Sequence, residues 1–580
     1  MKPNSQFKGG GGLLAFILFS TAVAFGAQPA GLQVSVYCTA GDVEHYLTAP
    51  EGRRRVLETM RPLGVTRLFL EGRRGDEYVA PQQLQELRAF FATNGIACSG
   101  GIATVPGANF GTRQQGELGW LNWESRQTQT GVAEFFTQNA PVFDELIVDD
   151  FFCTGDVSAA SHAARGARSW GDYRRDLLVS LVQPMIVQPT RQASRHTKLI
   201  IKFPQWYDRF HLFGYDPPRM AANFAEVWVG TEVRNPLTRR MGFVQPTEGY
   251  MNFRWLTSIA GRKVRGAWFD HIECSAQNFV DQAYQSVLAG AGELTLFRLG
   301  DVMEGHPGDA RLASRLPELR ELAADLRHQT RRGIAFYKPP GSTSEDNLYL
   351  ADYLGMIGLP LLPVAEYPRA AAVAILPVQA AHDPQLLERM RRHLRRGATV
   401  VVTPALLRAL GAEAANLAGV EPTAEPQPAK ASEIQFADQR LRLETPLELD
   451  ARLKATGCDV WQSAVIAGAA VPLLTSKAIG PGRLCVLNLR TFSEEDFRAS
   501  GEWLLPPRPL GLPVIPTELA NDLRRHLLGP MKLDFRSPAG VTLVLGGQRA
   551  WLYSFRDEST QVQFNGKSHT LPPHGLISVR

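Results

Sequence analysis

Eight short runs of apolar and β-branched residues, spaced along residues 32–301, constrain the fold of this 580-residue chain most strongly. The stretches between them are amphipathic, and those at residues 52–64 and 81–95 end on glycine, as helices often do. Nearly continuous apolar strands that alternate with helices predict a parallel sheet buried on both faces. Eight such units predict a closed (β/α)8 barrel and favour it over an open doubly wound sheet. The runs are residues 32–39, 65–72, 95–105, 145–152, 198–206, 225–232, 264–273 and 293–301.

The pattern changes after the barrel, which we place at residues 28–328. Residues 329–425 predict a compact α/β domain of strand, helix, strand, helix, strand. It carries neither a GxGxxG nor a GxxxxGK[ST] motif, so no cofactor is predicted. Residues 426–580 contain strand-like pieces and the hairpin signal FNGK, which predict a mostly β region.

The first 27 residues predict a signal peptide. Lys2 and Lys8 precede the apolar run at residues 13–25, and the small residues Gly26 and Ala27 follow it. The run is short for a membrane span, although a retained N-terminal anchor is an alternative. We therefore expect a secreted or periplasmic protein without stable membrane insertion.

The composition is that of a globular protein and does not indicate nucleic-acid binding. Hydrophobic residues make up 44% of the chain and charged residues 21%, as in ordinary globular proteins. The formal charge of +5 is small for this length and no basic block stands out, so nucleic-acid binding is not predicted.

Ionisable and aromatic residues stand where the predicted barrel strands end. Active sites of such barrels lie at the carboxyl ends of the strands. Two adjacent acids, Asp149 and Asp150, follow the fourth strand, and Glu232 and Asp270 follow the sixth and seventh. The other candidate substrate-binding residues at these ends are Tyr37, Glu71, Lys202, Trp206, Glu273 and Arg298.

Acids and aromatic rings at one opening indicate a carbohydrate site, because aromatic faces stack on sugar rings and charged groups hydrogen-bond hydroxyls. Glycoside hydrolysis commonly uses two carboxyl groups. Strand alternation predicts that Asp149 and Asp150 do not both point inward, and we assign Asp150 to the reaction and Asp149 to substrate binding. Either Glu232 or Asp270 supplies the second carboxyl group. The alternative is that these acids form buried ion pairs with Arg234, Arg298 or Lys202.

The order of barrel, α/β domain and β region resembles that of the family 42 β-galactosidases. Residues 350–364 and 371–404 are similar to the trimerisation domain of that family, which has a flavodoxin-like, amidotransferase-like fold. The resemblance implies a homo-oligomer in which this domain serves assembly. No cysteine lies between Cys274 and Cys458, which agrees with the loss of an amidotransferase nucleophile.

This chain departs from that family at the site. The Asn-Glu pair after the fourth strand is absent, and Asp149-Asp150 stands there instead. A strand-four aspartate also resembles the α-galactosidase type of barrel, in which it is the nucleophile and an acid after strand six donates the proton. That resemblance implies Asp150 as nucleophile and Glu232 as acid/base.

The sequence thus predicts a secreted glycoside hydrolase that acts on an oligosaccharide or glycoside. One alternative is a non-catalytic carbohydrate-binding or assembly protein on the same scaffold. A second is a metal-dependent hydrolase or lyase that uses Asp149, Asp150, Asp270, His271 and Glu273 as oxygen-rich ligands.

Overall fold

The structure is a computed structural model that describes residues 31–343, 345–422 and 425–580. The predicted signal peptide lies outside these residues. In the part that is described, no helix is long and apolar enough to cross a membrane.

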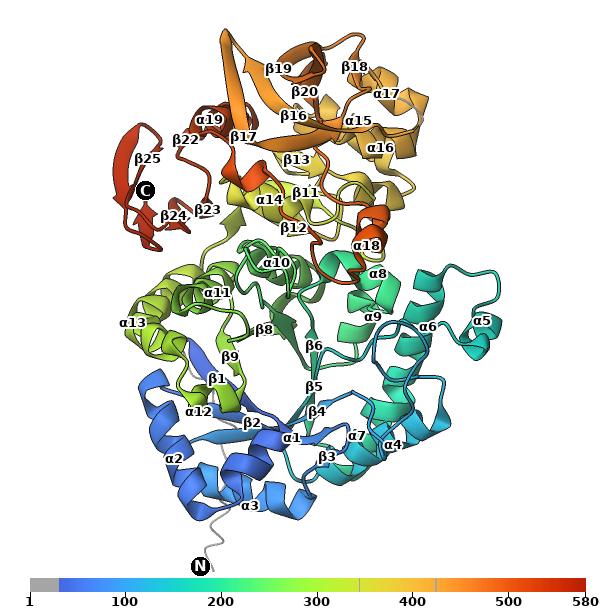
Figure 1. Ribbon diagram of the computed structural model, residues 1–580, viewed down its shortest axis with the longest axis vertical. Coiled ribbons are helices and arrows are strands. Elements are labelled where there is room, and N and C mark those ends of the chain that lie inside the picture. Colours follow the sequence, from blue (N-terminus) through green and yellow to red (C-terminus); the bar gives the residue numbers. More distant parts are fainter. Residues whose placement is uncertain (1–30, 344, 423–424) are drawn as a thin grey trace, which may run out of the picture. The chain divides into compact units, whose positions relative to one another are not determined.

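Eight parallel strands form the first sheet, as the apolar runs predicted (Figure 1). Strand β1 pairs with both β2 and β9, which closes the sheet into a barrel. The short antiparallel strand β3 (Glu77–Tyr78) adds to the edge of β2 beyond the barrel. The barrel strands are β1 (Gln33–Cys38), β2 (Arg67–Arg74), β4 (Ala97–Ala103), β5 (Glu145–Val148), β6 (Lys198–Phe203), β7 (Glu226–Gly230), β8 (Val264–Asp270) and β9 (Glu293–Phe297).

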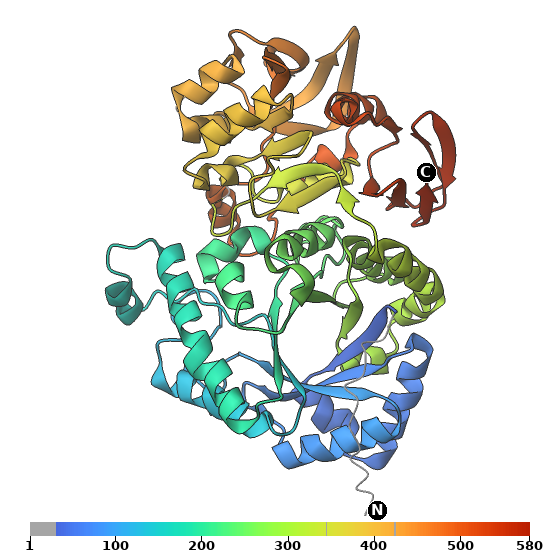
Figure 2. The same cartoon turned by 180° about the vertical axis from the view of Figure 1, so that it is seen from behind.

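Helices follow the barrel strands in chain order and cover the outside of the barrel (Figures 1 and 2). Their apolar faces bury residues such as Leu84, Val132 and Phe279 against the outward side chains of the strands. The principal helices are α2 (Pro50–Met60), α3 (Pro81–Thr93), α4 (Arg126–Asn139), α6 (Trp170–Val182), α7 (Gln188–Ala193), α9 (Pro217–Ala221), α10 (Glu248–Ala260), α11 (Ala276–Ala289) and α13 (Pro307–Arg327).

A layer of large side chains fills the interior of the barrel. Because side chains alternate along a strand, each strand presents every second residue inward. Trp228 lies wholly inside and donates a hydrogen bond to Thr295 over 2.9 Å. Gly266 leaves room for it, since a β-carbon there would stand 2.1 Å from the indole. The layer contains Tyr37, Phe69, Ile147, Ile200, Trp228 and Trp268, with Phe297 packed against it.

A second sheet lies beyond residue 330. Its parallel part has the strand order β12-β11-β13-β14-β21, as in flavodoxin-like folds. These strands are β11 (Ile334–Tyr337), β12 (Leu361–Val364), β13 (Val373–Leu376), β14 (Thr399–Val402) and β21 (Gly482–Leu487). Helix α14 (Leu350–Met356) packs by one face of the sheet, and α15 (Leu386–Arg395), α16 (Pro404–Leu410) and α17 (Ala412–Ala418) pack on the other.

This sheet runs across the boundary that we expected at residues 425/426, and that boundary is corrected here. Strand β21 pairs in parallel with β14, and its other edge takes up the antiparallel strand β20. The hairpins β16–β17 and β19–β20 then extend the sheet. These strands are β16 (Pro428–Phe436), β17 (Gln439–Asp450), β19 (Asp459–Ile466) and β20 (Ala469–Ile479).

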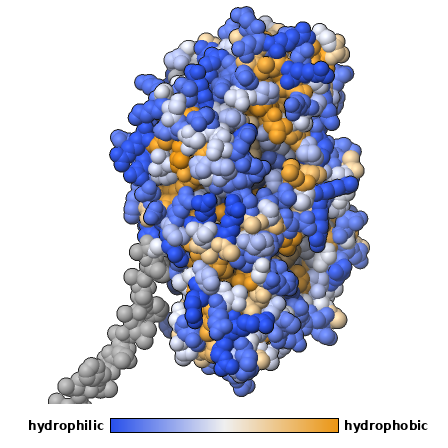
Figure 3. All heavy atoms as spheres, turned by 60° about the vertical axis from the view of Figure 1, so that its left-hand side comes forward, coloured by the Kyte–Doolittle hydropathy of each residue, from blue (hydrophilic) through white to orange (hydrophobic). Residues whose placement is uncertain are grey.

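The last part of the chain is mostly β, as predicted. Helices α18 (Glu494–Ser500) and α19 (Thr517–Leu528) precede strands β22 (Phe535–Arg536), β23 (Val541–Gly546), β24 (Arg549–Ser554), β25 (Thr560–Phe564), β26 (Lys567–Leu571) and β27 (Leu576–Val579). Strand β10 (Arg331–Arg332), which directly follows the barrel, pairs with β23. On the face in Figure 3 hydrophilic residues predominate and hydrophobic residues form smaller patches between them, as expected when most apolar side chains enter the core.

Candidate active site

An ionisable layer lies directly above the aromatic layer of the barrel. Three of its members stand two residues after an inward-facing residue on the same strand. Glu71 follows Phe69, Lys202 follows Ile200, and Asp270 follows Trp268. The interior alternation therefore continues from apolar to charged side chains at the carboxyl ends of the strands.

The ammonium group of Lys202 is the centre of this layer. Its Nζ lies 2.6 Å from Asp150 Oδ2 and 2.8 Å from Glu232 Oε1, and 3.9 Å from Asp149 Oδ1. It also lies 4.6 Å from the centre of the Trp268 ring, at cation–π distance. The side chain of Lys202 is only 2% exposed, so the positive charge is paired in a site with little water.

Asp149 and Asp150 both approach Lys202, which corrects the expectation from strand alternation. Strand β5 ends at Val148, so the two acids belong to the turn that follows, where the period of two no longer holds. The Asp149 carboxylate accepts a hydrogen bond from the Asp150 backbone N–H over 2.7 Å. The Tyr215 hydroxyl donates to the Asp150 carbonyl oxygen, which further holds this turn.

The two adjacent acids have opposite pKa shifts. Burial and the neighbouring negative charge of Asp150 raise the pKa of Asp149 well above its usual value. Burial also acts to raise the pKa of Asp150, but the Lys202 ammonium and the hydrogen bond from Asp149 outweigh it, and the net shift is downward. Asp150 is therefore the acid of this pair that stays ionised.

Glu232 has the electrostatic properties of a proton donor. Its pKa is raised by burial and by the charges of Asp150 and Asp270, although Lys202 acts in the opposite direction. Lys202 contacts only its Oε1, whereas Oε2 is buried without a hydrogen-bond partner among the described residues. Gly230 makes space for this oxygen, because a β-carbon there would lie 2.4 Å from it.

Asp270 is held by an arginine. Arg234 Nε lies 2.9 Å from one oxygen of Asp270 and Nη2 lies 2.5 Å from the other. The backbone N–H of Ile272 donates to the same carboxylate. The buried ion pairs of the alternative interpretation are therefore present: Asp270 pairs with Arg234, and Asp150 and Glu232 pair with Lys202.

Glu71 is also enclosed by hydrogen-bond donors. It is fully buried and accepts hydrogen bonds from the Tyr37 hydroxyl over 2.7 Å and the Ala40 backbone N–H over 2.9 Å. Arg74 donates to both of its oxygens, at 2.9 Å each, and its Nη2 lies 3.3 Å from Asp149 Oδ2. Tyr37 and Glu71 therefore support the ionisable layer from inside the barrel.

Sequence reasoning missed Arg74 because of a β-bulge. The register of β2 against β4 shifts between Glu71 and Arg73, which places Gly72 as the extra residue. Glu71 and Arg74 consequently share the inward face at a spacing of three instead of two. The glycine between Glu71 and the two arginines was the only signal for this bulge in the sequence.

Three predicted site residues form no hydrogen bond or ion pair with Lys202 or its acids within the described part of the chain. Glu273 forms an ion pair of 2.9 Å with Arg240, and Arg298 lies 3.6 Å from Asp301 with 43% of its side chain exposed. Trp206 is buried, and its indole N–H has no partner among the described residues.

The ligands of the metal-dependent alternative do not come together. His271 contacts Phe297 and Asp309 through its two ring nitrogens, and Glu273 is paired with Arg240. Asp149 and Asp150 surround an ammonium group instead. Within the described residues, no three His, Cys, Asp or Glu side chains are arranged to hold a metal ion.

Residues 24–315 match a family model described as the catalytic domain of a probable glycosyl hydrolase, which covers the whole barrel. The chain belongs to this glycosyl hydrolase family. It is an enzyme of the glycoside hydrolase class, and its substrate is a carbohydrate.

Residues 330–435 match a second family model, the second domain of the uncharacterized protein SSO3021. That protein, from Saccharolobus solfataricus, is 22% identical over 415 residues, which span 65% of this chain and 68% of the relative. The name of that protein states no function, so this similarity indicates no substrate.

Solved structures confirm the architecture. A catalytic mutant of Gan42B, a GH42 β-galactosidase from G. stearothermophilus, matches with a TM-score of 0.64 and 11% identity over 95% of this chain and 98% of its own. The β-galactosidase of Halorubrum lacusprofundi matches with a TM-score of 0.63 and 13% identity over 95% and 99%. An α-L-fucosidase from Paenibacillus thiaminolyticus matches with a TM-score of 0.60 and 11% identity over 92% and 93%. The predicted resemblance to family 42 therefore holds for the fold.

The role of Lys202 can be tested by Lys202→Met, which keeps the side-chain volume and removes the charge. We expect unfolding free energy to fall by about 3–5 kcal/mol, because breaking a buried ion pair leaves the acids uncompensated. Chemical denaturation followed by tryptophan fluorescence measures this. Lys198→Met on the same strand is the matched control: that side chain is 51% exposed and 3.9 Å from Glu145, so about 1 kcal/mol or less is expected. Equal losses in the two variants would contradict the central role of Lys202.

Proposed function

We propose that Asp150 is the nucleophile and Glu232 the acid/base of this glycoside hydrolase. The observation that carries the proposal is the pair of contacts from Lys202 Nζ, 2.6 Å to Asp150 and 2.8 Å to Glu232. One ammonium group thus holds two acids of opposite pKa shift side by side. The pKa of Asp150 is lowered, so this acid is ionised and can act as a nucleophile. The pKa of Glu232 is raised, so this acid can hold and donate a proton.

Asp270 is the weaker candidate for the second carboxyl group. Arg234 binds both of its oxygens and so occupies the positions through which a proton would be transferred. Glu232 instead keeps Oε2 without a partner among the described residues. This difference favours Glu232 and leaves Asp270 as a charge that raises the pKa of Glu232.

The spacing of the acids supports a retaining mechanism. Because both contact the same nitrogen, Asp150 Oδ2 and Glu232 Oε1 lie no more than about 5.4 Å apart, the sum of the two contacts. Retaining glycosidases place their carboxyl groups about 5–5.5 Å apart, whereas inverting enzymes need about 6.5–9.5 Å to admit a water molecule. Asp150 would form the glycosyl–enzyme bond, and Glu232 would protonate the leaving oxygen and then activate water.

The two roles can be separated with aryl glycosides of different leaving-group acidity. Asp150→Asn should lower kcat by roughly a thousandfold or more on every substrate, since the nucleophile is lost. Glu232→Gln should lower it by about 10²–10⁴ on poor leaving groups and far less on nitrophenyl glycosides, which need no proton. NMR of the first-formed sugar should show the anomer of the substrate.

Glu273→Gln serves as the control, since that acid lies at the rim and pairs with Arg240. It should leave kcat within about twofold. If Asp150→Asn retained wild-type turnover, or if the inverted anomer formed first, the assignment of Asp150 as nucleophile would be wrong.

The pKa shifts predict a bell-shaped pH dependence of kcat/KM. Activity requires ionised Asp150, so the acidic limb should lie below the usual aspartate value of about 3.9. It also requires protonated Glu232, so the alkaline limb should lie above the usual glutamate value of about 4.3. Glu232→Gln, assayed on a nitrophenyl glycoside, should abolish the alkaline limb and keep the acidic one. Loss of the acidic limb in that variant would reverse the two roles.

We also propose that the enzyme is exported. The support is the sequence of residues 1–27, with its basic start, apolar run and small residues. When the full chain is expressed in a bacterial host, mass spectrometry of the mature N-terminus should find cleavage after Ala24, Gly26 or Ala27 and the protein outside the cytoplasm. An intact N-terminus on cytoplasmic protein would refute export.

A further inference from the structure

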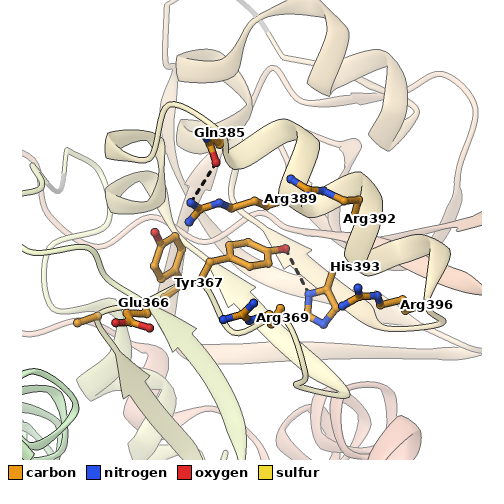
Figure 4. Close-up of a pocket in the computed structure, with 10 residues that line it drawn as sticks. Glu366, Tyr367, Arg369, Gln385, Arg389, Arg392, His393 and Arg396 are labelled. Atoms are coloured by element: carbon orange, nitrogen blue, oxygen red, sulfur yellow. Dashed lines mark hydrogen bonds between the residues drawn. The ribbon is translucent and has the colours of Figure 1, made fainter.

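The connection between strands β12 and β13 contains no helix. Both strands pair in parallel with β11, so the chain crosses over β11 between them. Such crossovers usually carry a helix that packs on the sheet. Residues 365–372 are all described and contain no helix. A cavity of about 530 Å³ lies between this loop and helix α15 (Figure 4).

The cavity lies where open α/β sheets bind ligands. The strand order reverses around β11, which is flanked by β12 on one side and β13 on the other. Ligands of such sheets bind beyond the carboxyl ends of the strands at this reversal. Tyr337 is the last residue of β11, and residues 365–369 directly follow β12. The volume falls within the range of about 300–1,000 Å³ that is typical of small-molecule sites.

The lining carries an excess of positive charge. It contains four arginines and one acid, Glu366. Figure 4 shows three of the arginines on α15 and directly after it, and Arg369 on the loop opposite. The four are Arg369, Arg389, Arg392 and Arg396.

Two of these guanidinium groups are free to bind an anion. Arg389 lies 3.0 Å from Asp383, and Arg392 lies 3.3 Å from Glu388. Arg369 and Arg396 have no acidic partner among the described residues, and both are exposed. Guanidinium groups present paired N–H donors that match the oxygens of carboxylate, sulfate and phosphate.

Hydrogen bonds hold the aromatic side chains that line the cavity. His393 is buried, and its Nε2 lies 2.7 Å from the Ala371 carbonyl oxygen, to which it donates. Its Nδ1 then accepts from the Tyr367 hydroxyl at 3.2 Å, as Figure 4 shows. The Tyr337 hydroxyl donates a hydrogen bond to Asp383 over 3.2 Å. The rings of Tyr337 and Tyr367 pack edge to face, with 5.5 Å between their centres. Such fixed rings are suited to contact the apolar face of a sugar.

We propose that this cavity is a second, non-catalytic carbohydrate site, which binds an acidic saccharide. A carboxylate, sulfate or phosphate group of the saccharide pairs with Arg369 and Arg396, and its ring lies against Tyr367, which the buried Tyr337 supports from behind. The site is built from the α/β domain alone, so it stands apart from Asp150 and Glu232. A glycoside hydrolase with this site holds an acidic glycan in addition to the sugar at its barrel.

Titration calorimetry of the full chain at low ionic strength tests the proposal. The probes are a galacturonic acid disaccharide, a sulfated lactose and a sugar phosphate, with neutral lactose and inorganic sulfate as comparisons. We expect saturable binding of at least one acidic saccharide and none of lactose at this site. The double variant Arg369→Gln/Arg396→Gln should weaken that binding roughly tenfold or more, since both charged donors to the anionic group are lost.

Arg395→Gln is the matched control. Arg395 is an exposed arginine of the same helix that does not line the cavity and lies 3.6 Å from Glu388. It should change the affinity by less than about twofold. Neither variant should change kcat on a neutral glycoside, so this test is independent of the assignment of Asp150 and Glu232.

Four results would overturn the proposal. The first is that no acidic probe binds saturably, and the second is that Arg395→Gln loses as much affinity as the double variant. The third is that inorganic sulfate binds as tightly as the acidic saccharides. The fourth is that the mass of the double variant in light scattering differs from that of the wild type. The last would show that the arginines contact another copy of the chain instead of a saccharide.

Discussion

The buried charge of Lys202 is the interaction on which the barrel mouth depends. An ammonium group removed from water costs several kcal/mol unless acids compensate it. Lys202 stands on the inward face of β6, two residues after Ile200, and its side chain is only 2% exposed. Asp150 and Glu232 therefore have to reach Lys202 from the ends of β5 and β7, the two strands that flank β6. Their spacing, and with it the reaction that they can perform, follows from this one nitrogen.

The remaining acids differ in function because their cations differ. Glu71 is bound by Arg74 and Asp270 by Arg234, each arginine reaching both oxygens of its acid. Asp150 and Glu232 instead share one lysine, which makes a single contact to each. Each arginine occupies both oxygens of its acid, whereas the shared ammonium group leaves Oε2 of Glu232 without a hydrogen-bond partner among the described residues. Arg74 and Arg234 thus bind the acids that flank Asp150 and Glu232, the pair that we assign to catalysis.

Much of the fold was predictable from local pattern, and the site only in part. The eight apolar runs and the acids that follow them were visible, because strand periodicity and strand ends are local properties. Arg74 was not predicted as a site residue, because one bulged residue at Gly72 reverses the direction of every later side chain of β2. The boundary at residue 425 failed for a related reason: a hairpin does not reveal in its own sequence which sheet edge it joins, and β20 joins β21.

The sequence by itself determined that acids, a lysine and aromatic rings end the strands of one barrel, since each strand carries these residues in its own few positions. Only the tertiary structure decided that Lys202 pairs with Asp150 and Glu232, that Arg234 takes Asp270, and that a crossover without a helix leaves a cavity beside α15. The physical reason is distance along the chain. Residues 52 and 30 positions apart meet at Lys202 only after the barrel closes, and no local preference encodes which cation each acid reaches.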